Sequence, residues 1–332
     1  MGMRFLLRIS ITISFLRRPV VRAAMVLLLF HAYGQGVEAG ALDGVKRVTC
    51  VSLIAGMSCT GVGCSIGLNS HQPVTAADQR MLDSVISAPK FQLEKPVVVY
   101  FLSQIHAKLG VRSVQYSFLG DERWKKILEQ DSGASETVVS QLGILRFLQA
   151  NRDKYVFSEG HTEALYPSTL ITLHDLIKST ASTGFVVKGI DSDSLQFLAY
   201  YRELEESFQI IPETYDELSG SQKSLLYFGG AEIAWYLGFS PMILPLETKD
   251  LNKKAIDGVL RSGFSSWITS GGSNSWQIFD AREIVAYIFL TSQLKVLDAD
   301  EAVLIFGAGH RLEDYRVPNL RVIRLETRRV YY

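Results

Sequence analysis

Short runs of β-branched and aromatic residues alternate along this chain with longer segments of helical spacing. Five runs have the length and composition of buried strands: KPVVVYFLS, KYVFSEG, SPMILPLE, EAVLIFGAGH and NLRVIRLE. Between the first two, SETVVSQLGILRFLQANRD places apolar side chains at helical intervals, at Val138, Leu142, Leu145 and Leu148. The pattern therefore predicts a helix over 135–153, with Ser135 as its cap.

Other segments also have the periodicity and end signals of helices. Four more helices are expected, over 192–209, 221–238, 250–263 and 280–294. Gly238 marks the end of the second, and Asp280 is the expected cap of the last.

The alternation of strands and helices predicts the fold class. We expect an α/β fold, in which a mixed, mostly parallel sheet is flanked by helices on both faces. A single domain is expected over 71–332. The stretch at about 165–225 is poor in strands, so it is interpreted as a helical insertion or a cap over the edge of the sheet.

Hydrophobic residues make up 47% of the chain, enough for a sizeable core. The 34 basic and 34 acidic residues balance over the whole sequence. They are unevenly spread, because 65–332 carries 27 Lys or Arg against 32 Asp or Glu, a formal net charge of about −5. A mildly acidic body lacks the basic face that nucleic-acid binding requires, so no nucleic-acid partner is expected.

The N-terminal segment has the residue order of a secretory signal. Three arginines, Arg17, Arg18 and Arg22, precede the apolar run AAMVLLLF, and the small residues of VEAGA follow it. This is the order of n-region, h-region and cleavage site. We therefore expect 1–70 to be a signal or targeting segment. The protein is expected to be exported, to the periplasm or the surface of a bacterial cell.

A second copy of this pattern ends in cysteines, as a bacterial lipoprotein signal does. Lys46 and Arg47 precede VTCVSLIAGMSCTGVGC, although no aliphatic residue stands three positions before Cys59 or Cys64. Cleavage, lipidation and a single uncleaved anchor therefore stay open, and the last two would attach the protein to a membrane. All three cysteines lie in the N-terminal fifth. The body accordingly has neither a disulfide framework nor a thiolate metal site.

Ionisable side chains follow three of the predicted strands, at the point where each strand ends. The segments SQIH, EGH and GAGH contain His106, Glu159, His161 and His310. In an open α/β sheet, ligands bind beyond the carboxyl ends of the strands, where neighbouring strand ends meet. Imidazoles and a carboxylate gathered there could hold a divalent metal ion or act as a general acid and base. These four residues are the expected ligands of a divalent metal of unknown identity, with haem as the less favoured cofactor.

Two further charged residues are assigned to this site. Arg282 falls in the first turn of an expected helix, where the helix dipole disfavours a cation. That position indicates a partner carboxylate or an anionic ligand, although a plain surface arginine explains it equally well. Glu232 interrupts the apolar segment GGAEIAWYLG and is expected either to pair with Arg282 or to contribute to the site.

The order of these motifs resembles a known superfamily. SQIH, SQLGILRFL, FSEGH, GGAE, DAREIVAYI and FGAGH follow one another within 97–326. This order is similar to that of the superfamily that groups TraB/PrgY, Tiki, ChaN-like and erythromycin-esterase-like proteins. GAGH and the upstream RE are its most specific parts. The first tetrad departs from the pattern, since Ser103 stands where the family prefers glycine and Gln104 where many members carry glutamate.

The resemblance implies a mixed α/β sheet with its site at the strand ends. It also implies catalytic residues, namely His106, Glu159 and His310, with Arg282 and Glu232 beside them. Members include metal-dependent peptidases, a haem- or iron-associated lipoprotein and antibiotic-lactone hydrolases.

Two functions are consistent with these residues. The first is an exported hydrolase, peptidase- or esterase-like, that acts on a peptide or small-molecule substrate. Its histidines and glutamate would hold a metal or activate water directly, and Arg282 would stabilise a developing anion. The second is a secreted or lipid-anchored protein of the same fold that binds a metal, haem or another ligand without turnover. An ordinary serine hydrolase is not expected, because the sequence has no G-x-S-x-G elbow.

Overall fold

A computed structural model of the protein describes residues 74, 76–108, 111–161, 163–183, 192–248 and 272–327. The expected targeting segment at 1–70 and the expected helix over 250–263 lie outside the described residues.

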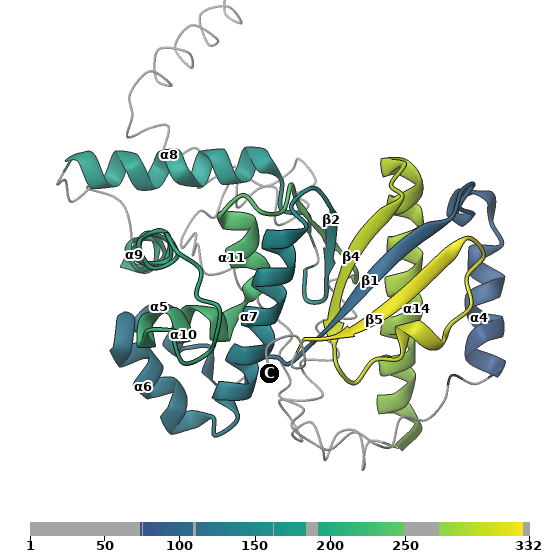
Figure 1. The fold of residues 1–332 in the computed structure, drawn as a ribbon. Coiled ribbons are helices and arrows are strands. Elements are labelled where there is room, and N and C mark those ends of the chain that lie inside the picture. The colour runs from purple at the N-terminus through teal and green to yellow at the C-terminus, as the bar shows by residue number, and fades with distance from the viewer. Residues whose placement is uncertain are drawn as a thin grey trace, which may run out of the picture. The chain divides into compact units, whose positions relative to one another are not determined.

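The described strands form one parallel sheet (Figure 1). Its strands are β1 (Val97–Gln104), β2 (Tyr155–Ser158), β3 (Ile243–Pro245), β4 (Glu301–Gly307) and β5 (Leu320–Glu326). Their order across the sheet is β3-β2-β4-β1-β5, and each neighbouring pair is parallel. The prediction of an α/β fold with a mostly parallel sheet and flanking helices is confirmed. All five strands coincide with the five apolar runs of the sequence.

Helices cover both faces of this sheet (Figure 1). The bounds are α4 Ala76–Ile86, α5 Val114–Ser117, α6 Gly120–Gln130, α7 Ala134–Ala150, α10 Gly220–Phe228, α11 Gly230–Tyr236 and α14 Gly272–Leu297. Two 3₁₀ turns lie at Pro89–Phe91 (η1) and Leu312–Asp314 (η3). One face packs against α14 and α4. The other packs against α7, onto which α10 and α11 pack in turn.

The side chains of β1 point alternately to the two faces of the sheet and pack against helices on both. Val99 and Phe101 belong to the core cluster that faces α14. Tyr100, between them, turns to the other face, and its ring centre lies 5.9 Å from that of Phe147 on α7. A strand buried on both faces needs apolar residues at nearly every position, which is the pattern of a parallel sheet.

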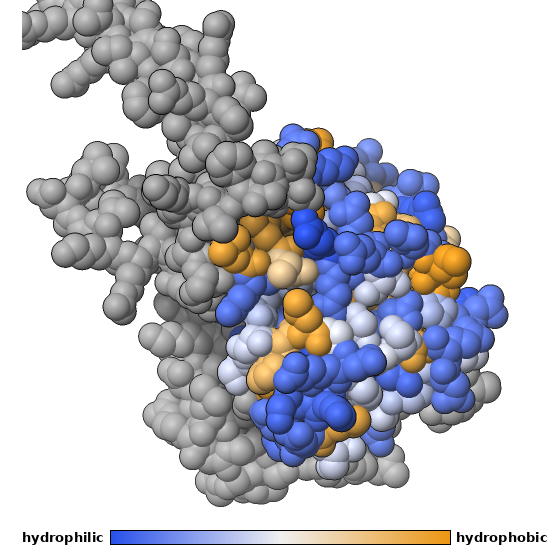
Figure 2. Space-filling model, turned by 90° about the vertical axis from the view of Figure 1, so that its left-hand side faces the viewer, coloured by the Kyte–Doolittle hydropathy of each residue, from blue (hydrophilic) through white to orange (hydrophobic). Residues whose placement is uncertain are grey.

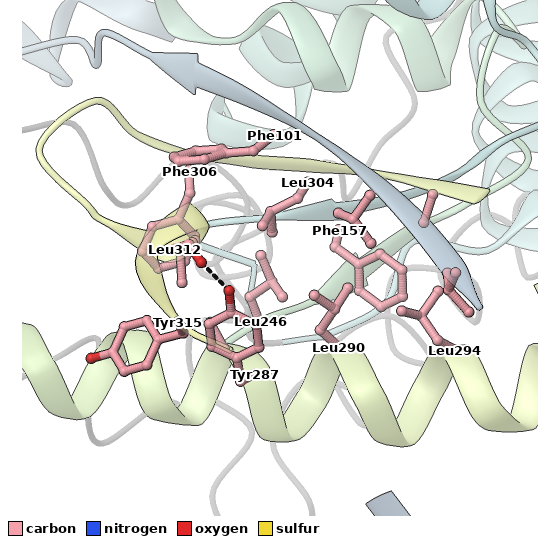
Figure 3. Packing of buried hydrophobic residues seen from close by; sticks show 14 of the residues in the cluster. Phe101, Phe157, Leu246, Tyr287, Leu290, Leu294, Leu304, Phe306, Leu312 and Tyr315 are labelled. Atoms are coloured by element: carbon pink, nitrogen blue, oxygen red, sulfur yellow. Dashed lines mark hydrogen bonds between the residues drawn. The ribbon is translucent and has the colours of Figure 1, made fainter. Parts of the chain in front are cut away.

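The core between the sheet and α14 is built from large side chains of both (Figure 3). Phe157 from β2 and Leu304 from β4 meet Leu290 and Leu294, which lie one helical turn apart on α14. Burial of one such side chain contributes roughly 1.5–3 kcal/mol. This packing holds α14 against β2 and β4, the two strands that lead to Glu159 and His310.

Contacts divide the described residues into two compact units. One contains Ser168–Arg202, which comprises most of α8 (Pro167–Thr183) and α9 (Ser192–Ser207). The other holds the sheet and the remaining helices. Within the described part of 165–225, the regular elements are α8, α9 and α10, all of them helices. The domain boundaries at 1–70 and 71–332 stay predictions.

Three expected helix boundaries differ from the structure. The segment 221–238 is not one helix, because Gly229 separates α10 from α11. Gly229 has an extended backbone, and a Cβ there would lie 2.0 Å from Glu232 Oε2. Ser135 lies inside α7, whose cap is Gly133, and its hydroxyl bonds to Tyr215 instead. The helix expected to begin at Asp280 begins at Gly272.

The surface carries scattered apolar side chains. Figure 2 shows one face on which hydrophilic residues predominate and apolar residues form small patches among them. Val296 and Ile210 are the most exposed large apolar residues described, at 82% and 80%. Among the described helices, none combines the length and apolar character needed to cross a membrane.

Candidate functional site

The carboxyl ends of β1, β2 and β4 are adjacent, because β4 lies between the other two strands. His106 follows β1 and Glu159 follows β2, and 2.9 Å separates His106 Nε2 from Glu159 Oε2. The carboxylate is 3% exposed, whereas the imidazole keeps 11% of its surface exposed. The structure thus brings together two of the residues that the sequence placed at strand ends.

Gly307, the last residue of β4, lets these side chains approach. A Cβ at this position would lie 3.0 Å from His106 Nε2, 3.1 Å from Glu159 Oε2 and 3.4 Å from His310 Cδ2. The three side chains therefore occupy the space around the bare Cα of Gly307, where any larger residue would intrude. His106, Glu159 and His310 accordingly belong to one cluster.

The Glu159 carboxylate is surrounded by hydrogen-bond donors. Oε2 accepts a hydrogen bond from His106 and another from the backbone N–H of Gly307. Oε1 accepts one from Arg282 Nη2 at 2.6 Å and lies 3.7 Å from His310 Nε2. Hydrogen bonds to the charged form of a carboxyl group favour that form.

The charge of Glu159 decides how the proton of His106 is placed. Burial alone would raise the pKa of Glu159, but the Arg282 guanidinium and His106 outweigh it and hold that pKa well below its usual range. An ionised carboxylate can only accept hydrogen bonds, so His106 Nε2 must be the donor. In the neutral ring, Nδ1 then keeps its lone pair. Among the described residues, no hydrogen-bond partner contacts this nitrogen.

Arg282 lies between two buried carboxylates. Besides Glu159 it contacts Glu247, which follows β3, with Nε 3.0 Å from Oε2 and Nη2 3.3 Å from Oε1. Glu247 Oε1 also accepts a hydrogen bond from the N–H of Gly160 at 2.7 Å. Burial opposes the charge of Arg282, but Glu247 and Glu159 outweigh it and raise its pKa. Arg282 therefore stays a cation and ties the ends of β2 and β3 to α14.

Arg282 does not lie at the start of its helix, as the sequence had led us to expect. Because α14 begins at Gly272, Arg282 lies ten residues beyond its first residue, and the placement in the first turn is wrong. The expected partner carboxylate is present twice. A plain surface arginine is excluded, since the side chain is only 9% exposed.

His310 pairs with a second carboxylate, that of Glu283 on α14. His310 Nδ1 lies 3.2 Å from Oε1, which also accepts a hydrogen bond from the N–H of Arg311 at 3.0 Å. Oε2 accepts hydrogen bonds from the Tyr315 hydroxyl at 3.1 Å and from Arg311 Nη2 at 3.3 Å. The segment after β4 is thereby attached to α14. A hydrogen bond from the Tyr287 hydroxyl to the carbonyl of Leu312 adds to this attachment (Figure 3).

Two carboxylates favour the charged form of His310. Burial alone would lower the pKa of His310, but its contacts with Glu159 and Glu283 outweigh burial and raise it. For Glu283, burial would raise the pKa, and His310 and Arg311 lower it. Three basic side chains therefore face three carboxylates in this cluster: Arg282, His310 and Arg311 against Glu159, Glu247 and Glu283.

His161 and Glu232 form a separate pair. His161 Nε2 lies 3.0 Å from Glu232 Oε1, and no described contact joins either side chain to Glu159 or Arg282. The expected pairing of Glu232 with Arg282 is therefore not found. Gly160 has a φ of +89°, which lets the side chains on either side of it turn to different partners. His161 Nδ1 is buried and has no hydrogen-bond partner among the described residues.

Helix α7 holds the backbone that leads to His106. The hydroxyl of Ser140 accepts a hydrogen bond from the N–H of Ile105 at 3.0 Å. The side chain of Gln141 donates to the carbonyl of Ile105 at 2.9 Å and lies 3.3 Å from Gln104 Oε1. Gln104 thus contributes to this attachment.

The arrangement favours hydrogen bonding within the cluster over metal binding. A cation held by His106, Glu159 and His310 would need the lone pairs of His106 Nε2 and Glu159 Oε2. Those two atoms share a hydrogen bond with each other, and Oε2 also accepts one from Gly307. In the parts of the chain that the structure describes, no group of three or more His, Cys, Asp or Glu side chains is arranged to hold a metal. The residues present do not fit a divalent ion in this arrangement.

Glu247 and Glu283 were not assigned to the site from the sequence. Glu247 is the last residue of the run SPMILPLE and lies two positions after β3, so the signal that identified Glu159 after β2 also applied to it. Glu283 is a charged residue within an apolar helix, and it is fully buried. A buried carboxylate requires a cationic or hydrogen-bonding partner, which both residues have.

Comparison with models of known protein families, with curated proteins and with solved structures finds no match.

Proposed function

We propose that this protein is a hydrolase in which His106 is the general base that activates water. The observation that carries this proposal is the 2.9 Å hydrogen bond between His106 Nε2 and the buried, ionised Glu159. This bond orients the imidazole and directs its basic nitrogen, Nδ1, away from the carboxylate. A histidine held by a carboxylate in this way is the base of many hydrolases.

In the proposed reaction, Nδ1 of His106 takes a proton from a water molecule as the water attacks a carbonyl carbon of the substrate. The carbonyl double bond opens to a tetrahedral oxyanion, the ring becomes an imidazolium, and Glu159 stabilises the new positive charge across the existing hydrogen bond. The imidazolium then gives the proton to the leaving alcohol or amine as its bond to the carbonyl carbon breaks, which leaves the carboxylic acid and a neutral His106. General base catalysis of this kind contributes roughly 10²–10⁴-fold to the rate. Arg282 acts by keeping Glu159 ionised, since its own hydrogen bonds go to Glu159 and Glu247.

The sequence suggests which class of bond the protein hydrolyses and in which compartment the reaction takes place. The motifs that resemble the esterase- and peptidase-containing superfamily favour an ester, a lactone or a peptide bond. The signal-like segment at 1–70 favours a reaction outside the cytoplasm. A binding protein without turnover is the alternative, since a cluster of balanced charges could also serve to fix the fold of a ligand site.

The test compares hydrolysis by the wild type, His106→Gln and His174→Gln. The probes are p-nitrophenyl acetate, p-nitrophenyl butyrate and casein. His174 lies on α8, in the other compact unit, and serves as the matched control. We expect turnover by the wild type and the control, and a loss of at least about 100-fold in His106→Gln. If the wild type hydrolyses none of the probes, or if His106→Gln keeps its rate, the hydrolase proposal fails.

A further inference from the structure

Arg324 lies on β5, the edge strand next to β1, and so two strands away from β4. Its guanidinium nevertheless reaches the segment after β4. Nη1 donates to the carbonyl of His310 at 2.9 Å, and Nη2 donates to the carbonyl of Ala308 at 2.6 Å. From these contacts we propose that Arg324 is a positioning residue, which fixes the backbone of His310 and so its imidazole beside Glu159. This inference rests on the proposed function for its effect on turnover.

The path of the side chain is set by the sheet. Arg324 is the register partner of Phe101 on β1, and its guanidinium carbon lies 4.9 Å from the centre of that ring. A guanidinium stacks well on an aromatic ring, so Phe101 supports the side chain as it crosses β1. The side chain is only 18% exposed, which restricts it to this path.

Two carboxylates also accept hydrogen bonds from the guanidinium and hold it in place. Glu313, in the turn after His310, accepts a hydrogen bond from Nη1 at 2.6 Å, and Glu326 accepts one from Nε at 3.1 Å. Arg324 thus makes four hydrogen bonds, two to carbonyls and two to carboxylates. The planar fork of the arginine places donors on separate nitrogens that reach carbonyls two residues apart, whereas the three N–H donors of a lysine all lie on one nitrogen at the end of a flexible stem.

The carbonyls that Arg324 contacts belong to the turn that carries the histidine. The N–H of His310 donates a hydrogen bond to the carbonyl of Gly307 at 3.0 Å, which closes the turn of residues 307–310. Glu283 holds the imidazole from α14, whereas Arg324 holds the backbone from β5. With both anchors in place, His310 Nε2 lies 3.7 Å from Glu159 Oε1. Loss of the second anchor leaves two carbonyls without these donors and frees the turn to move.

The experiment compares Arg324→Lys and Arg324→Ala with Arg321→Ala in the full chain. Arg321 is exposed on the same strand, and its side chain forms no hydrogen bond or ion pair with another described residue, so it is the matched control. Arg324→Lys keeps the charge facing Glu313 and Glu326 but loses the fork. Each variant is assayed for kcat and KM on p-nitrophenyl acetate. The imidazole signals of His310 are followed at pH 7 in long-range ¹H–¹⁵N spectra.

We expect kcat to fall about 10- to 100-fold in both Arg324 variants while KM changes little, because a displaced catalytic cluster slows chemistry more than binding. The signals of His310 should shift in both variants and stay in place in Arg321→Ala. Folded Arg324 variants with unchanged His310 signals would overturn the positioning role. If the wild type does not hydrolyse the probe, the hydrolase proposal fails, and the spectra still decide the role of Arg324.

Discussion

His106 Nε2 and Glu159 Oε2 lie 2.9 Å apart although 53 positions separate the two residues in the sequence. The contact arises because β1 and β2 flank β4, so that the ends of all three strands share one edge of the sheet. The same carboxylate also contacts Arg282 and faces His310. A single buried side chain, Glu159, therefore organises the cluster, and its replacement is the first test of the site.

Replacement of Glu159 by glutamine should destabilise the protein and abolish turnover. Glutamine replaces one carboxylate oxygen by an NH₂ group, which cannot accept a hydrogen bond. That group would face the donor of Arg282 on one side or those of His106 and Gly307 on the other. Removal of the charge also leaves Arg282 with one carboxylate fewer in a buried position. Breaking a buried ion pair in this way costs about 3–5 kcal/mol. Urea unfolding measures this loss.

The matched control for that variant is Glu129→Gln. Glu129 forms an exposed ion pair with Lys126 on α6, at 2.9 Å. Exposed pairs contribute at most about 1 kcal/mol. Equal losses of stability in the two variants would contradict the organising role of Glu159.

Alanine at position 307 should separate the two histidines from the carboxylate. The new methyl group would lie 3.0 Å from His106 Nε2 and 3.1 Å from Glu159 Oε2, closer than most real contacts. Overpacking of this kind costs about 1–3 kcal/mol. We expect a folded protein whose hydrolysis of p-nitrophenyl acetate is greatly reduced. Ala308→Ser, at the next and partly exposed position, should keep its rate. Unchanged turnover in Gly307→Ala would show that the cluster is not the site of reaction.

The free energy of unfolding should be greatest in weakly acidic solution. The pKa of His310 is raised from 6.5, so its contribution is complete below about pH 6.5 and is lost as pH rises through the folded-state pKa. The pKa values of Glu159 and Glu283 are lowered from 4.5, so their contributions are complete above about pH 4.5 and are lost as pH falls through the folded-state values. Urea unfolding over a series of pH values should show its maximum between these limits.

The variant His310→Gln separates the two flanks of this profile. The loss of stability on the alkaline side should shrink in the variant, because the titrating imidazole is gone. The acidic side keeps the contribution of Glu159, whose pKa Arg282 and His106 lower, and loses part of that of Glu283, whose pKa His310 lowers. A wild type that becomes steadily more stable from pH 6.5 to alkaline pH would contradict the raised pKa of His310.

Turnover should survive removal of divalent ions. His106 Nε2 donates to Glu159 in this arrangement, and the proposed base is a histidine nitrogen that needs no metal. We expect unchanged hydrolysis after prolonged treatment with 1,10-phenanthroline and EDTA. Loss of activity that added zinc, manganese, cobalt or iron restores would instead support the metal site that the sequence suggested at His106, Glu159, His161 and His310.

The strands were predictable because a parallel sheet leaves a strong local signal. Each strand is buried on both faces and is therefore a continuous apolar run, as in β4, where Ala302 to Phe306 are all buried. The residues after such runs were predictable site candidates for the same reason. His106, Glu159 and His310 were all identified from their position directly beyond a strand.

The contacts made by α14 were not predictable in this way. Its pairs, Arg282 with Glu247 and Glu283 with His310, depend on how the helix lies over the sheet. Periodicity gives the existence of a helix but not its rotation against distant strands. The contacts of Arg324 were not predictable for a similar reason, since its side chain crosses β1 to reach a turn that follows a different strand.

The strand order also determines when the site can exist. β1 pairs with β4 through Val98 and Glu301 and with β5 through Val98 and Arg321, so the middle of the sheet joins distant parts of the chain. Closing such long loops is slow, because chain entropy is lost before the contacts form. During synthesis, His106 and Glu159 are made long before His310. A growing chain therefore carries an incomplete cluster, and the complete one arises only after the C-terminal strands have been inserted.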